Sequence, residues 1–98
     1  MSPDIFPGFI KIHILHHASK AKICGVEMMA ELKRHGYGIS PGTLYPTLHS
    51  LETKGYLRSE EVVERGRMRK YYCITGSGEK MLAEAREKVR ELVEEVLE

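Results

Sequence analysis

The sequence predicts a mainly α-helical domain that carries one small β-hairpin. Apolar residues recur with helical spacing in three successive segments, two short β-branched and aromatic runs follow, and a long amphipathic helix ends the chain. The 98 residues suffice for a single hydrophobic core, and 42% apolar and 30% charged residues are ordinary proportions. This order is that of a winged helix-turn-helix domain. We expect that domain over residues 1–76 and a C-terminal dimerisation helix over residues 77–98.

Apolar spacing and turn residues bound the first three helices. The first is expected over residues 5–19, with Pro3 in its opening turn, and the second over residues 24–35. The third has leucines at helical spacing, and it can be capped by Ser40 and ended by Gly55.

A hairpin and a long helix complete the chain. The runs 57–63 and 68–74 are rich in β-branched and aromatic residues and are separated by a polar segment, which predicts two paired strands. The last helix is expected over residues 78–97, with Thr75 or Ser77 as its cap.

The third helix has an unusual outer side. Leu44, Leu48 and Leu51 fall within about 40° of one another on a helical wheel and mark the core side. The opposite side is small, polar and almost uncharged, whereas a solvated helix normally carries Glu, Lys and Arg. Such a surface suits a helix that enters the major groove of double-stranded DNA. The residues expected to contact DNA from this helix are Ser40, Gly42, Thr43, Tyr45, Pro46, Thr47, His49 and Ser50.

Pro46 lies inside this helix, where a proline costs about 3 kcal/mol. The carbonyl that loses its partner belongs to Gly42 in the first turn, and the proline ring faces away from the core. We interpret the proline as shaping the DNA-reading end of the helix, with the Tyr45 hydroxyl reaching a phosphate. The alternative is that the helix begins at Pro46 and residues 40–45 form a loop, because residues before proline avoid helical dihedral angles.

A basic patch marks the hairpin. It consists of Arg65, Arg67, Arg69 and Lys70. As the wing of the domain, these residues are expected to contact phosphates or the minor groove. The three alternating arginines would share one strand face if the strand extended as far as Arg65. The alternative is a solvated turn whose charges pair with Glu60, Glu61 and Glu64.

The segment SPGTLYPTLHSLETKGYL, followed by RMRKYYCITGSGEKML, resembles the PadR family of bacterial and archaeal transcriptional regulators. The resemblance runs from about residue 14 to residue 82, and its GTLYP segment is specific. Gly25 also matches, whereas Val26 replaces the usual aromatic residue. The resemblance implies a homodimeric DNA-binding repressor. It also admits a small-molecule effector at the dimer interface, because some short members bind flat aromatic compounds there.

The last helix carries a heptad-like apolar stripe that is wider than a small domain needs. Packing against the domain's own core is one explanation. We favour pairing with a second subunit, because the resemblance implies a dimer formed by the first and last helices. The expected dimerisation residues are Phe6, Phe9, Ile10, Leu82, Ala85, Val89, Leu92, Val93 and Val96.

Other functions have less support. His13, His16 and His17 together with Cys24 suggest a metal site, but the remaining ligands of tetrahedral zinc are not evident, so we expect neither a metal nor another cofactor. No nucleophile motif or phosphate-binding glycine loop indicates an enzyme. The rival to DNA binding is a winged-helix module that binds another protein.

The chain is expected to be cytoplasmic and to have no membrane contact. No run approaches the roughly 20 apolar residues that span a bilayer, and no export signal is evident at the N-terminus. Cys24 and Cys73 are widely separated, so they are expected to be free thiols.

Overall fold

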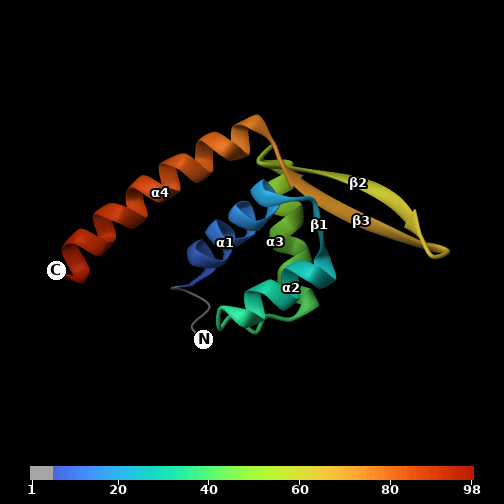
Figure 1. Cartoon of the computed structure of the whole chain (residues 1–98), viewed down its shortest axis with the longest axis horizontal. Helices are drawn as coiled ribbons and strands as arrows, with labels where there is room; N and C mark the ends of the chain where they lie inside the picture. Colours follow the sequence, from blue (N-terminus) through green and yellow to red (C-terminus); the bar gives the residue numbers. More distant parts are fainter. Residues whose placement is uncertain (1–5) are drawn as a thin grey trace.

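The computed structural model of the chain describes residues 6–98. Within them the elements are α1 (Pro7–Lys20), β1 (Ile23–Cys24), α2 (Gly25–Arg34), α3 (Pro41–Thr53), β2 (Leu57–Glu64), β3 (Arg67–Ile74) and α4 (Gly76–Val96) (Figure 1). The prediction of a mainly helical winged helix-turn-helix domain is confirmed. The expected start of the first helix at residue 5, with Pro3 in its first turn, lies outside the described residues; within them α1 begins at Pro7.

The sheet has one strand more than the predicted hairpin. The strand order is β1-β3-β2 and both pairings are antiparallel, with Ile23 opposite Tyr72 and Cys24 opposite Tyr71. The sequence did not predict β1, because a strand of two residues has no periodicity to detect.

A two-residue turn closes the hairpin. The register pairs Leu57 with Ile74 and ends with Glu64 opposite Arg67, which leaves Arg65 and Gly66 as the turn. Both have positive φ values, 51° and 77°, as the type I′ turn of a tight hairpin requires. Arg65 therefore belongs to the turn. Because β3 begins at Arg67, the strand does not extend to Arg65, and only Arg67 and Arg69 can share a strand face.

α3 is continuous through its proline. It begins at Pro41, with Ser40 at the N-cap position, and runs past Pro46 to Thr53. The alternative that the helix starts at Pro46 is therefore wrong. The Ser40 hydroxyl makes no capping hydrogen bond to the backbone, and its Oγ lies 3.5 Å from Thr43 Oγ1.

The core lies among α1, α2 and α3 and against the base of the sheet. Its most deeply buried side chains are Ile14, Met28, Leu32, Leu44, Leu48, Leu57 and Leu82. The three leucines that the helical wheel placed on the core side of α3 are all buried, which leaves the opposite side of that helix at the surface.

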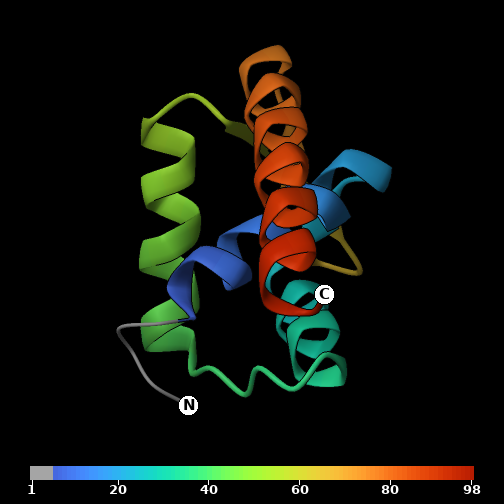
Figure 2. The ribbon, with the colours of Figure 1, turned by 90° about the vertical axis from the view of Figure 1, so that its left-hand side faces the viewer.

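α4 and the hairpin leave this core in opposite directions (Figure 1). They give the molecule a longest dimension of 52 Å against a shortest of 20 Å. Every residue from Arg86 to Glu98 is exposed, so the last half of α4 packs on little of its own domain. Figure 2 shows α3 standing clear of α4.

Candidate DNA-binding surface

A tight turn after α2 sets the position of α3. Gly36 has a φ of 90°, and the Tyr37 amide donates a hydrogen bond of 2.9 Å to the Leu32 carbonyl. Tyr37 and Ile39 then pack against the core. Both ends of this connection are thereby fixed, and α3 is held across α2 as the second helix of a helix-turn-helix.

The outer side of α3 is exposed as the sequence predicts. Ser40, Gly42, Thr43, Pro46 and His49 are exposed, whereas Thr47 and Ser50 are half-buried. The Thr47 hydroxyl donates a hydrogen bond of 2.8 Å to the Thr43 carbonyl, so that hydroxyl is turned back onto the helix. No charged side chain occurs between Ser40 and Ser50.

Tyr45 of α3 lies beside the start of α2. Its side chain is 43% exposed, but its ring lies against Gly25 in the first turn of α2. A Cβ atom at Gly25 would fall 2.6 Å from Tyr45 Cε1, so a side chain at this position would require the Tyr45 ring to shift. The hydroxyl thus lies beside Gly25 in this structure. Val26, which replaces an aromatic residue of the family pattern, is exposed beside this contact.

The four residues of the basic patch, Arg65, Arg67, Arg69 and Lys70, are all exposed. Among residues 6–98, Arg65 and Arg67 have no carboxylate oxygen within 4.0 Å. Arg69 donates a hydrogen bond of 3.5 Å to Cys24 Sγ, and Lys70 Nζ lies 3.9 Å from Glu52 Oε1.

The acids of the hairpin do not neutralise its arginines. Glu60 pairs with Lys22 at 3.4 Å, and no basic side chain of the described residues lies within 4.0 Å of Glu61 or Glu64. Interaction with the Glu64 carboxylate, followed by burial, raises the pKa of Tyr71 to about 12. The alternative of a turn paired with these three acids is therefore not observed.

One depression joins α3 to the hairpin. It has a volume of about 240 Å³ and is lined by Cys24, Gly25, Val26, Tyr45, Arg67, Met68, Arg69 and Lys70. The start of α2, the exposed edge of α3 and the basic strand β3 therefore form one continuous surface.

Sequence reasoning missed an apolar pair on the wing. Met68 and Val63 lie opposite each other in the register, and both are more than half exposed. Apolar side chains are often the part of a DNA-binding protein that wedges between base steps in the minor groove. The signal for this pair is the strand alternation, which puts both residues on one face of the hairpin.

The residues expected at a dimer interface divide into two groups. Ile10 and Leu82 are 6% and 1% exposed within the core of this chain, so the expectation that they face a partner is wrong. The other seven reach the surface, from half-buried Phe6, Phe9 and Ala85 to exposed Val89, Leu92, Val93 and Val96.

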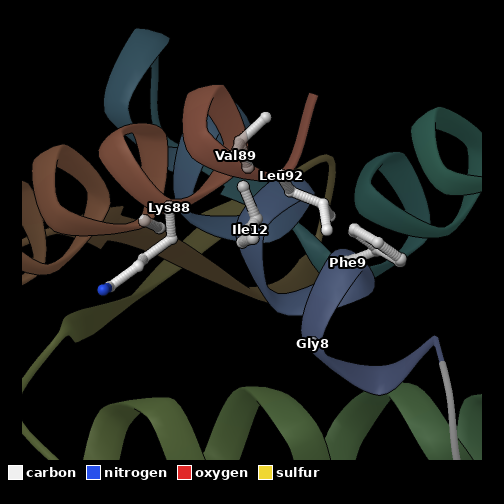
Figure 3. A pocket seen from close by; sticks show the side chains of 7 residues that line it. Gly8, Phe9, Ile12, Lys88, Val89 and Leu92 are labelled. Carbon is white, nitrogen blue, oxygen red and sulfur yellow. The ribbon is translucent and has the colours of Figure 1, made fainter. Parts of the chain in front are cut away.

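An apolar groove lies between α1 and α4. Its volume is about 360 Å³, and it is lined by Gly8, Phe9, Ile12, Ala85, Lys88, Val89 and Leu92. Figure 3 shows Phe9 and Ile12 of α1 close to Leu92 of α4, with the Lys88 ammonium directed away from them. Among residues 6–98, no helix is both long enough and apolar enough to cross a membrane.

Comparisons with known proteins agree with this geometry. Residues 14–84 match the model of the transcriptional regulator PadR-like family. The chain is 50% identical to the transcriptional regulator Rv3488 of Mycobacterium tuberculosis, over 90% of this chain and 82% of that protein.

Solved structures extend the likeness to the whole fold. A PadR-like transcription factor from Bacteroides fragilis has 33% identity and a TM-score of 0.81, covering 91% of this chain and 87% of the other. The protein smu.1704 of Streptococcus mutans has 35% identity and a TM-score of 0.80, covering 88% of this chain and 82% of the other.

The family and its members are regulators of transcription and not enzymes. With its winged-helix fold and this family match, the chain belongs to the PadR-like family of DNA-binding transcriptional regulators.

Proposed function

We propose that this protein is a sequence-specific repressor that binds its operator as a homodimer, with α3 in the major groove and the hairpin on the backbone or in the minor groove. The observation that carries the proposal is the uncharged, exposed outer side of α3 together with the exposed basic patch of the hairpin; a depression between Tyr45 and the basic strand β3 connects the two elements. The two parts have different tasks in recognition.

α3 supplies the specificity. Side chains that enter the major groove must be small enough to fit and polar enough to meet base edges. Thr43, His49 and Ser50 meet both requirements, and Pro46 offers an apolar edge to a thymine methyl group. The free amide of Gly42 in the first turn is suited to a phosphate, because helix N-termini favour anions.

The hairpin supplies most of the affinity. Arg65 and Arg67 have no carboxylate partner among the described residues, so DNA phosphates can bind them without breaking an existing ion pair. Each phosphate neutralised by a basic residue releases counterions and makes binding weaker as salt rises. Met68 and Val63 extend this surface into the minor groove.

A second copy of the chain covers the exposed side of α4. The 21 residues of α4 span about 32 Å at 1.5 Å per residue, and its apolar stripe is unprotected beyond Ala85. A two-fold dimer buries this stripe and the neighbouring groove, and it sets two α3 helices about 34 Å apart on successive turns of DNA. A small-molecule effector would have to enter the same groove, between α1 and α4.

The competing function is a winged-helix module that binds another protein. Such a module would present an acidic or strongly apolar side on α3. The outer side of α3 is instead small and polar and lies beside four exposed basic residues, which favours DNA.

Fluorescence anisotropy tests the proposal. The duplex is the DNA upstream of this protein's own gene, and a scrambled duplex at the same salt concentration is the control. We expect the native duplex to bind at least about 10³-fold more tightly. Arg67→Ala should weaken binding to both duplexes and reduce the salt slope by about one, while His49→Ala should reduce the preference for the native duplex.

Arg90→Ala is the matched control, since it removes the same charge from α4, far from the proposed surface. Equal affinity for every duplex, including those from a random-sequence selection, would establish a general DNA binder instead. No binding at low salt would favour the protein-interaction module.

A further inference from the structure

Three histidines from two helices converge on the side of the domain away from the hairpin. His13 and His17 lie on α1 and His35 caps α2, and their nitrogen atoms all lie within 4.8 Å of one another. The rings of His13 and His35 are stacked, with centroids 4.7 Å apart. Each imidazole offers one nitrogen to the shared space.

The arrangement has the spacing of a helix-borne metal site. His13 and His17 are one turn apart on α1, and Glu31 is one turn before His35 on α2. Glu31 Oε2 lies 4.0 Å from His17 Nε2, although this carboxylate is not among the groups whose ligand atoms all lie within 4.8 Å of one another. Arg34 Nη1 contacts both carboxylate oxygens, at 3.2 and 3.3 Å, so Glu31 has to turn from Arg34 to reach an ion.

His17 carries a buried atom that the protein does not satisfy. Among the described residues, its Nε2 is a buried side-chain nitrogen without a hydrogen-bond partner. Buried polar atoms are nearly always paired, and an unpaired one calls for an explanation such as an ion. A bound cation would accept the Nε2 lone pair directly.

We propose that His13, His17 and His35 bind one divalent transition-metal ion, with zinc as the best fit and the Glu31 carboxylate as the fourth donor. Imidazole and carboxylate ligands in a tetrahedral set suit Zn²⁺. At Zn–N distances of about 2.0–2.1 Å, tetrahedral nitrogens lie about 3.4 Å apart. Modest side-chain rotations close the present spacing to that value.

The set differs from the one that the sequence suggested. Cys24 bonds to Arg69 on the hairpin side, and His16 does not share the ligand space. His35 lies 18 residues beyond His17 and joins the site only through the packing of α2 on α1, so no short sequence motif reveals it.

The ion would join two helices with different roles. α1 lines the proposed dimer groove, and α2 packs against α3 in the helix-turn-helix. The metal site itself does not depend on the proposed operator binding, because its evidence comes from α1 and α2 alone.

Isothermal titration calorimetry of the metal-free full chain with Zn²⁺ tests the proposal, and the absorption bands of Co²⁺ report the coordination geometry. We expect one ion per chain and a tetrahedral Co²⁺ spectrum. Loss of a supporting group around a metal costs about 10–100-fold in affinity, so the loss of a direct ligand in His35→Ala should cost at least about 100-fold. Glu31→Gln should cost about 10-fold or more.

His16→Ala is the matched control, because it removes a neighbouring histidine of the same helix that is not in the set. His35 is exposed, so its replacement should leave the far-UV circular dichroism of the metal-free chain unchanged. Absence of saturable Zn²⁺ binding overturns the proposal, and so does binding that His35→Ala leaves intact or that His16→Ala weakens equally.

Discussion

The contact between Gly25 and Tyr45 joins the start of α2 to α3. The tyrosine ring lies where a Cβ atom at position 25 would stand, so a larger residue there would require the ring to shift. Gly25→Ala should therefore lower the free energy of unfolding by about 1–3 kcal/mol and weaken DNA binding, because Tyr45 must move. Thermal unfolding followed by circular dichroism and DNA anisotropy measure the two effects.

Gly38→Ala is the control for this substitution, since a Cβ at Gly38 would meet nothing within 4 Å. The double variant Gly25→Ala/Tyr45→Ala should lose less stability than the two single changes added together, because the clash is removed. Simple additivity would show that the contact between the two residues is not the cause.

Pro46 is expected to lower the stability of the domain while supporting the recognition of DNA by α3. It removes the hydrogen bond to the Gly42 carbonyl, yet the helix continues past it with the ring exposed. Pro46→Ala should raise the free energy of unfolding by up to about 3 kcal/mol, since the missing bond is restored. It should also reduce the preference for the native duplex over a scrambled one. A variant that is more stable but discriminates as well as the wild type would refute a role for the proline in reading DNA.

At the level of the elements, Thr75 ties α4 to the end of α3. Its hydroxyl accepts a hydrogen bond of 3.0 Å from the Gly78 amide and donates one of 2.5 Å to the Gly55 carbonyl. Thr75→Ala removes both bonds and should lower the free energy of unfolding by about 1–2 kcal/mol, the usual range for loss of a helix cap. Urea denaturation measures this change. The sequence also offered Ser77 as the cap, but Thr75 holds that position. Ser77→Ala should therefore change the free energy of unfolding by less than about 0.5 kcal/mol.

The apolar spacing in the sequence predicted α3 correctly but was ambiguous for α4. Leucines at helical spacing predicted α3 and its core side correctly, because burial in this helix follows a single 3.6-residue period. The same argument placed Leu82 on a dimer surface. An apolar stripe does not tell whether its residues face the chain's own core or a partner, and on α4 Leu82 packs inside while Leu92 does not.

Contacts between residues that are distant in the sequence could not be predicted from local sequence patterns. The pairing of β1 with β3, the fit of Tyr45 on Gly25 and the approach of His35 to His17 each join residues from different elements. Their local sequence carries no signal of the partner. The candidate DNA surface was predictable, because the residue composition of α3 and of the hairpin is distinctive within each segment. The histidine site was not predictable, because it joins residues of two separate helices.

The whole molecule has two projections on one small core, and each has a different partner in the proposed function. The hairpin carries basic residues toward DNA, while α4 carries an apolar stripe in the opposite direction (Figure 1). An isolated α4 of this kind has little to stabilise its last turns, because helices in proteins depend on packing of an apolar face. The proposed dimer supplies that packing and at the same time fixes the spacing of the two DNA-reading helices.

Leu92→Glu tests this arrangement at the level of the assembly. Leu92 is 46% exposed in the single chain, so a charge there should leave the folded domain intact but oppose burial against a second α4. Sedimentation velocity should show a dimer for the wild type and a monomer for the variant at the same micromolar concentration. DNA affinity should fall at least about 10-fold, because one half-site is lost from each binding event.

Ala83→Glu is the control, because it places the same charge about 180° around the helix, and this variant should remain a dimer. A wild-type monomer, or a Leu92→Glu dimer, would rule out α4 as the dimerisation element and leave its exposed stripe to a different partner.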